Sequence, residues 1–302
     1  MTERSQRTAR SPTIVEHRIT GTGDAPYDVA VTGDGAVWIT LISGHAVLRR
    51  TVDGAIGRIP LGEAARPALC ATASNDSVWV TDTADGRLVQ IGPEGVRRAV
   101  SVPTPDAGPF GVAAAITGDV WFTEMQADSI GCLHADGTVT EIPSGPAGGM
   151  PSMIASSGAG IVFTLNQGNA IGRLPSGGDA VEIIDLPTDA AGPVGITVAR
   201  DGAVWFAEII AGQIGRMDRQ GTITEFPLPD RSSKPHAVES DPAGGCWFTL
   251  WGSTQLGHIA EDGAMNLIDL PTPGSEPHGL AVAADGIVWV ALEAGLLAEV
   301  RP

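Results

Sequence analysis

Tryptophan recurs along this chain at a nearly constant spacing, and this spacing constrains the fold more than any other feature. Six tryptophans are separated by intervals of 41, 42, 84, 42 and 42 residues: Trp38, Trp79, Trp121, Trp205, Trp247 and Trp289. The double interval contains Ile161-Val162-Phe163-Thr164, in which Val162 takes the place of a tryptophan. The chain therefore contains seven units of about 42 residues each.

Each unit repeats the same order of short segments. A Pro-x-Gly sequence or a variant of it opens the unit, and a short apolar segment, a turn such as Asp201-Gly202 and the tryptophan segment follow. A third segment carries Ile-Gly-Arg, as at 214–216, and a second turn leads to a fourth segment such as 222–226. Four short strands per unit at this period are typical of a propeller blade. We predict an all-β, seven-bladed β-propeller with four antiparallel strands per blade.

The two ends of the chain predict how the ring closes. The seventh unit stops at Pro302 without a fourth strand, whereas residues 13–19 have the character of a fourth strand without a blade. Pairing these ends would close the last blade with the N-terminal strand and hide both sheet edges. We therefore expect one propeller domain over 13–302 and a flexible N-terminal tail over 1–12. A β-solenoid is the structural alternative, and the split final repeat favours the propeller.

Composition restricts the partners and the compartment. The net charge is −17, from 18 Lys and Arg against 35 Asp and Glu, which argues against nucleic-acid binding. Three scattered cysteines without a C-x-x-C motif favour buried thiols over a disulfide framework or a zinc knuckle. Residues 1–12 lack the apolar core of a signal peptide, and no segment approaches membrane-spanning length. We expect a cytoplasmic monomer without nucleic-acid or membrane partners.

The residue after each opening proline differs between units, unlike the shared pattern around it. In a propeller the first strand of each blade lines the central channel, so these seven residues should surround one mouth of the channel. They are Tyr27, Ala68, Phe110, Ser152, Val194, His236 and His278. Apolar and aromatic surface with two histidines on neighbouring blades is typical of a ligand-binding site.

The last hairpin adds two acids to this mouth. Strands at 280–282 and 287–292 joined by a turn would bring Glu276 and His278 beside Glu293. Glu276 is the only acidic residue that precedes an opening proline, and Glu293 lies four positions after Trp289.

Other acids and histidines recur in ways that packing explains. Three acids lie three positions after their tryptophans, and we interpret them as structural: Asp82, Glu124 and Glu208. The four remaining histidines lie on predicted outer strands or loops, where surface or packing roles are expected: His17, His45, His134 and His258.

At the residues of this mouth, the chain resembles the virginiamycin B lyase (streptogramin B lyase) family. The resemblance covers nearly all seven units, and its specific segments are 208–216, Lys234-Pro235-His236-Ala237 and Glu276-Pro277-His278-Gly279. The chain departs from the family pattern at three positions: Val162 replaces tryptophan, and Leu165 and Leu250 replace glutamate. These departures affect the expected substrate pocket more than the expected chemistry.

The resemblance implies a carbon–oxygen lyase that linearises streptogramin B-type cyclic depsipeptide antibiotics by elimination at the ester (lactone) bond, which gives antibiotic resistance. It implies that His278 is the catalytic base, that Glu276 and Glu293 hold Mg²⁺, and that His236 contacts the substrate. Such roles suit the chemistry, because imidazole titrates near neutrality and a cation stabilises developing negative charge. We add Tyr27 as a substrate-binding residue from its position at the mouth, whereas Phe110 and Trp251 suit either a pocket or a core.

Three alternatives remain. A metal-dependent lactone hydrolase would use the ion to activate water, and its product would be heavier than the substrate by one water. A non-catalytic propeller would bind a ligand without converting it. A lyase of the same mechanism would act on a different depsipeptide or peptide.

Overall fold

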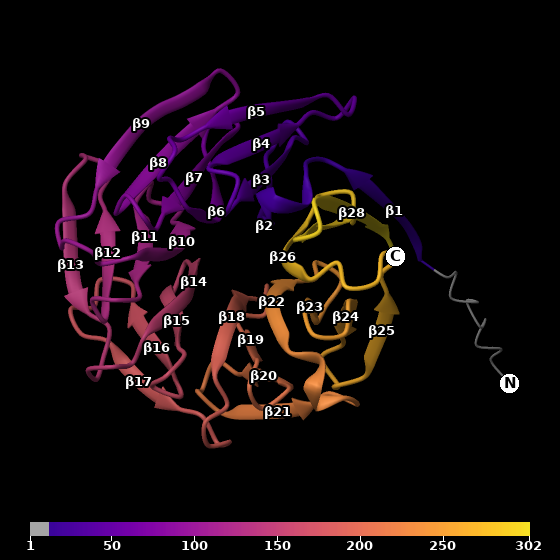
Figure 1. Ribbon diagram of the computed structural model, residues 1–302. Coiled ribbons are helices and arrows are strands. Elements are labelled where there is room, and N and C mark those ends of the chain that lie inside the picture. The colour runs from indigo at the N-terminus through magenta and orange to yellow at the C-terminus, as the bar shows by residue number, and fades with distance from the viewer. Residues whose placement is uncertain (1–11) are drawn as a thin grey trace, which may run out of the picture.

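A computed structural model describes residues 12–302 of the chain, and these residues form seven four-stranded antiparallel sheets around a central axis (Figure 1). Blade 1 contains β2 (Pro26–Val31), β3 (Val37–Leu41), β4 (Ala46–Arg50) and β5 (Ile56–Pro60). Blade 2 contains β6 (Pro67–Ala73), β7 (Ser77–Asp82), β8 (Arg87–Gly92) and β9 (Gly95–Ser101). Blade 3 contains β10 (Pro109–Ala114), β11 (Val120–Glu124), β12 (Ser129–Leu133) and β13 (Val139–Pro143).

The second half of the ring repeats this arrangement. Blade 4 contains β14 (Pro151–Ser157), β15 (Gly160–Leu165), β16 (Ala170–Pro175) and β17 (Glu182–Asp185). Blade 5 contains β18 (Pro193–Val198), β19 (Val204–Glu208), β20 (Gln213–Met217) and β21 (Ile223–Pro227). Blade 6 contains β22 (Pro235–Ser240), β23 (Cys246–Leu250), β24 (Gln255–Ile259) and β25 (Met265–Asp269). Blade 7 contains β26 (Pro277–Val282), β27 (Val288–Leu292), β28 (Leu296–Arg301) and β1 (Thr13–Arg18).

The predicted fold class and ring closure are confirmed. Strand β1 pairs with β28 in an antiparallel register from Thr13 opposite Arg301 to Arg18 opposite Leu296, so the N-terminal strand completes the last blade. Figure 1 shows β1 and β28 side by side at the junction of the two chain ends. The expected N-terminal tail falls almost entirely on residues 1–11, which lie outside the described residues.

The shared sequence pattern has a packing explanation. Val162 faces Ala155 in the register in which Trp205 faces Thr197, so the valine does occupy the tryptophan position of blade 4. The glycine of the Ile-Gly-Arg segment is required because a Cβ at Gly215 would overlap the ring of Phe206. The large apolar side chains are therefore buried within and between the sheets.

A threonine on the second strand of five blades joins each of these blades to the next. Ala237 N–H donates to Thr249 Oγ1 (3.0 Å), and the Thr249 hydroxyl donates to the carbonyl of His278 in blade 7 (2.7 Å). The equivalent hydroxyls bond to the following blade from Thr40, Thr81, Thr123 and Thr164. Each bond fixes the backbone next to a mouth residue of the following blade.

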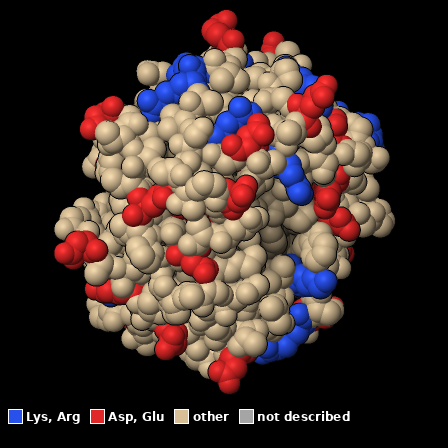
Figure 2. Space-filling model, turned by 60° about the vertical axis from the view of Figure 1, so that its left-hand side comes forward, with Lys and Arg blue, Asp and Glu red and all other residues tan. Residues whose placement is uncertain are grey.

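Two further features concern the surface and the membrane. Figure 2 shows acidic side chains scattered over one face of the molecule, where Lys and Arg form no continuous stripe. The helices among residues 12–302 are two three-residue 3₁₀ turns, η1 (Thr22–Asp24) and η2 (Arg231–Ser233), and no helix there is long and apolar enough to span a membrane.

One predicted boundary is wrong. Strand β26 begins at Pro277, three residues before the expected start at Leu280, because a bulge between Pro277 and Leu280 lets the pairing with β27 continue toward the mouth. The bulged segment contains His278, which therefore belongs to a paired strand instead of a loop.

Candidate functional site

Three mouth residues from blades 1, 6 and 7 gather at one place. The ring of Tyr27 lies 4.7 Å from that of His278 and 5.9 Å from that of His236, and the two imidazoles are 4.9 Å apart. The ring of Phe110 lies 6.3 Å from that of Tyr27 in an edge-to-face arrangement. The structure thus brings together the side chains that the sequence placed at this mouth.

The backbone places the two acids beside His278. Glu276 has a left-handed conformation (φ 53°), and its carbonyl accepts a hydrogen bond from the N–H of Glu293 (3.1 Å). Strand β27 ends at Leu292, opposite Pro277, so Glu293 lies just beyond the paired strand. Gly279 allows this approach to blade 1, because a Cβ there would overlap Asp28. The predicted meeting of Glu276, His278 and Glu293 is therefore present.

His278 is a buried imidazole held by one acid. Its Nε2 lies 3.0 Å from Glu293 Oε2, whereas its Nδ1 is buried and has no hydrogen-bond partner among the described residues. Burial lowers the pKa of His278 to about 4, against a smaller opposing effect of Glu276. The imidazole is therefore neutral at pH 7, and one of its two nitrogens carries a lone pair.

The two acids form a pair with excess negative charge. Glu293 raises the pKa of Glu276 through a side-chain hydrogen bond and like charge, and burial adds to this rise. Among residues 12–302, no cationic side chain forms an ion pair with Glu276, and Glu293 has only the imidazole of His278. The side chain of Glu293 is 36% exposed. Two accessible carboxylates without a neutralising partner are a donor set that suits Mg²⁺.

His236 and Tyr27 form the uncharged part of the mouth. The Tyr27 hydroxyl lies 3.5 Å from His236 Nε2. Burial, with a smaller contribution from His278, lowers the pKa of His236 to about 3, and burial raises the pKa of Tyr27. Both groups are therefore neutral at pH 7 and can form hydrogen bonds to a ligand without contributing charge.

Two residues next to the site were not assigned a role from the sequence. The ring of Trp251 lies 6.1 Å from that of His278, and the Lys234 ammonium lies 4.5 Å from the centre of the Trp251 ring. The indole N–H of Trp251 is buried and has no hydrogen-bond partner within residues 12–302. Thr249 fixes the His278 backbone through the blade-joining hydrogen bond. A threonine recurs in the tryptophan segments, and this recurrence marks Thr249 in the sequence. The repeat does not show that the ring of Trp251 reaches the imidazole of His278.

The acids interpreted as structural are sealed from solvent. Asp82, Glu124 and Glu208 are fully buried at the ends of their strands, and each faces the opening proline of its blade. Asp82 pairs with Arg87 at 2.9 Å, and Glu208 accepts from Gln213 at 2.6 Å. None of the three is available to a ligand at the mouth.

The predictions for most remaining histidines and for the cysteines also agree with the structure. His17 pairs with Glu299 and His258 pairs with Asp241, both at 2.9 Å, and His45 bonds to a backbone carbonyl. The three cysteines are buried and unpaired: Cys70, Cys132 and Cys246.

The fold and this mouth define a class: a seven-bladed propeller with two neutral imidazoles and an accessible acid pair at one end of its channel. The sequence profile of the Virginiamycin B lyase family matches residues 12–300, and the chain belongs to that family. The virginiamycin B lyase of Nocardia farcinica is 43% identical over 228 residues, which cover 75% of this chain and 77% of that protein.

Solved structures agree with this assignment. The virginiamycin B lyase of Staphylococcus aureus superimposes with a TM-score of 0.91 at 33% identity, over 97% of this chain and 100% of that one. A catalytically inactive histidine-to-alanine variant of that enzyme, solved with quinupristin, gives the same values. Hydrazine synthase of Kuenenia stuttgartiensis, at 13% identity and a TM-score of 0.77, shares the fold alone.

Proposed function

We propose that this protein is a carbon–oxygen lyase that opens the ring of streptogramin B-type cyclic depsipeptides by elimination at the ester bond, and so gives resistance to these antibiotics. The observation that carries the proposal is the neutral, acid-held imidazole of His278 beside Glu276 and Glu293 in a chain of the virginiamycin B lyase family. The relative solved with quinupristin supports the substrate class.

The proposed reaction conserves all atoms of the substrate. His278 takes the α-proton of the residue whose side chain forms the ester, and the electron pair of that C–H bond forms a carbon–carbon double bond. The ester C–O bond breaks, and the carboxylate leaves with its electron pair. The linear product is thus an isomer of the substrate.

The imidazole geometry selects the reacting nitrogen. Nδ1 of His278 is sealed from solvent, so Nε2 is the nitrogen that faces the open side, where Glu293 lies. Nε2 acts as a base only in the tautomer that carries the ring proton on Nδ1, so the proton that Nε2 donates to Glu293 must pass to that carboxylate or to solvent, and Nδ1 must be protonated, before the reaction begins. A positioned imidazole of this kind contributes on the order of 10² to 10⁴ in rate.

The acid pair has a second proposed task. Glu276 and Glu293 would hold Mg²⁺, whose positive charge would stabilise negative charge on the acyl oxygens of the substrate. A Glu293 carboxylate turned toward a cation would no longer accept a hydrogen bond from Nε2, and this would favour the tautomer in which Nε2 carries the lone pair. His236 and Tyr27 would donate hydrogen bonds to the lactone or to the leaving carboxylate.

The surroundings support two lesser proposals. Unpaired cysteines suit a reducing compartment, and we propose that the protein acts in the cytoplasm. The seven sheets form a closed ring, so the strands of one copy do not need to pair with those of another, and this supports a monomer.

The proposal is tested by incubating the protein with a streptogramin B depsipeptide and Mg²⁺ and measuring product mass. We expect a linear product of unchanged mass, with activity lost on chelation and in His278→Ala. A product heavier by one water would indicate a lactone hydrolase instead. Binding of the depsipeptide without any product would indicate a non-catalytic propeller, and full activity of His278→Ala would exclude this residue as the base.

A further inference from the structure

Blade 3 brings three metal-binding side chains together at the end opposite to the mouth that holds His278. Cys132 lies on β12, His134 follows that strand, and Asp119 precedes β11. The Cys132 Sγ is 3.6 Å from His134 Nδ1, and Asp119 Oδ1 is 3.7 Å from the same nitrogen. One ligand atom from each residue lies within 4.8 Å of the other two. The proposed lyase reaction uses none of these groups.

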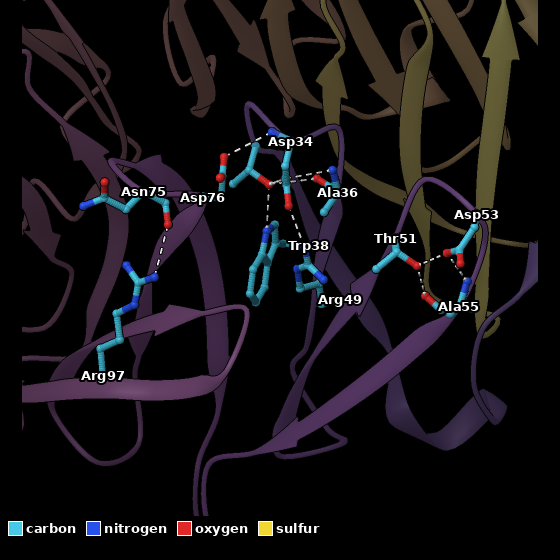
Figure 3. A network of polar contacts seen from close by, with 11 residues as sticks. Asp34, Ala36, Trp38, Arg49, Thr51, Asp53, Ala55, Asn75, Asp76 and Arg97 are labelled. Atoms are coloured by element: carbon cyan, nitrogen blue, oxygen red, sulfur yellow. Dashed lines mark hydrogen bonds and ion pairs between the residues drawn. The ribbon is translucent and has the colours of Figure 1, made fainter.

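The same place in blades 1 and 5 holds a simpler arrangement. In blade 1, Asp34 of the turn binds Arg49, which lies over the ring of Trp38 at 5.5 Å (Figure 3). Blade 5 repeats this pattern with Asp201 and Arg216, which are 2.8 Å apart.

Blade 3 departs from that pattern. Cys132 stands opposite Trp121 in the register position of Arg49 and Arg216, so the cation of the pair is replaced by a thiol. The acid is displaced along the turn to Asp119, and His134 supplies an imidazole that the other pattern lacks. Ion pairing over a tryptophan therefore does not explain the blade 3 cluster.

Two of the three ligand separations are close to those of a tetrahedral centre. Zinc with bond lengths near 2.3 Å to sulfur and 2.05 Å to nitrogen and oxygen requires ligand separations of about 3.6 Å for sulfur to nitrogen and about 3.3 Å for nitrogen to oxygen. The observed separations are 3.6 and 3.7 Å. A shift of a few tenths of an ångström in Asp119 would bring the second value into range.

The ligands are also oriented by outer hydrogen bonds. His134 Nε2 lies 2.9 Å from Thr140 Oγ1, and this hydroxyl can accept the Nε2 proton and so leave the lone pair of Nδ1 directed at the cluster. Asp119 accepts bonds from the Ala135 N–H (3.1 Å) and the Thr117 hydroxyl (2.9 Å). An imidazole fixed in this tautomer is the usual support of a metal-binding histidine.

We propose that Asp119, Cys132 and His134 bind a divalent cation of the zinc class, with water in a fourth position. The side chains of Asp119 and His134 are 28% and 36% exposed, whereas the thiol lies buried beneath them, so the ion would enter from solvent. The thiol proton leaves to solvent as the sulfur–metal bond forms. Burial raises the pKa of Cys132 to about 12, so this step opposes binding in the free protein.

Titration with Co²⁺ tests the proposal, because a cobalt–thiolate bond produces a charge-transfer absorption that oxygen ligands do not produce. We expect this band at one equivalent of Co²⁺, its loss in Cys132→Ser and its displacement by Zn²⁺. His134→Gln removes a ligand, and Thr140→Val removes its support, which should weaken binding about 10- to 100-fold.

Two controls separate this site from other cation sites. Cys246→Ala removes another buried cysteine and should keep the band, and Glu293→Gln should keep it because the proposed magnesium site has no sulfur. Circular dichroism and thermal unfolding verify that each variant is folded. Absence of the band in the unsubstituted protein at millimolar Co²⁺, or its persistence in Cys132→Ser, would overturn the proposal, whatever the outcome for the lyase activity.

Discussion

Blades 3 and 7 both place a pair of glutamates near the C-terminal end of the tryptophan strand. In blade 7 the pair is Glu276 and Glu293, and in blade 3 it is Glu124 and Glu141. Each pair includes an acid with a raised pKa: Glu293 raises the pKa of Glu276, and burial together with Glu141 raises the pKa of Glu124 to about 8. The two pairs therefore share an electrostatic property that is often taken as a mark of active sites.

Their surroundings differ in ways that decide what each pair can do. Both oxygens of Glu124 are buried and have no hydrogen-bond partner in the described part of the chain, while Glu141 accepts two bonds from Thr104 at 3.0 and 2.7 Å. A protonated Glu124 that donates to Glu141 satisfies this geometry. Glu293 is instead 36% exposed and bonded to an imidazole. A raised pKa thus identifies a functional acid only together with solvent access and a reactive neighbour.

Removing a charge from each glutamate pair in turn should give the largest difference in enzymatic activity between the two blades. Glu276→Gln and Glu293→Gln keep the side-chain shape and remove a charge, so we expect kcat/KM for ring opening to fall about 10²- to 10³-fold. The Mg²⁺ concentration for half-maximal activity should rise as well. Glu124→Gln is the matched control and should retain activity close to that of the unsubstituted protein. Equal losses in all three variants would mean that the damage comes from folding and not from the site.

The buried pair should instead affect stability, with a defined dependence on pH. Because the pKa of Glu124 is about 8 in the folded protein, the folded protein retains a proton that the unfolded chain loses near its ordinary pKa of 4.5. The folded state therefore loses stability as pH rises from about 4.5 to 8, and the full loss is present above pH 8.

Glu124→Gln removes this titration. We expect the variant to be more stable than the unsubstituted protein by roughly 2–4 kcal/mol at about pH 9 and nearly equal to it at about pH 4.5. Urea unfolding at the two pH values measures the difference. The partly exposed Glu276 provides the comparison, since Glu276→Gln should change the free energy of unfolding little at either pH. A Glu124→Gln variant that is less stable at pH 9 would show that the carboxylate is ionised and satisfied in the folded protein.

The sequence was sufficient to predict the ring and most of the mouth, because both depend on periodic features. The tryptophan spacing specifies one blade per unit, and the first residue after each opening proline then falls at an equivalent place in the channel. The meeting of Glu276 with Glu293 followed from hairpin pairing alone.

Other contacts depend on side-chain directions that a repeat does not encode. Trp251 follows Trp247 by four residues, as Glu293 follows Trp289, but this position does not show that the ring of Trp251 reaches His278 in the next blade. The position of His134 on an outer strand or loop predicts a surface or packing role, and the sequence does not show that Asp119, from before β11, lies beside it. The predicted start of β26 is three residues late because the pairing with β27 passes a bulge, which follows the opening proline in all seven blades.

The smallest expected effect concerns the backbone that carries His278, and it separates a positioning role from a structural one. Thr249 donates to the carbonyl of His278, and Thr164 makes the same bond at the same distance, 2.7 Å, to the carbonyl of Val194. Thr249→Val and Thr164→Val remove equivalent buried hydrogen bonds, so each should lower the free energy of unfolding by about 1–2 kcal/mol. Only Thr249→Val should also lower kcat, by a few fold, with KM nearly unchanged, because Val194 takes no part in the proposed chemistry. An equal fall in kcat for Thr164→Val would mean that the loss of one such hydrogen bond disturbs the whole propeller. The mouth at blade 7 would then differ from the rest of the channel in its side chains alone.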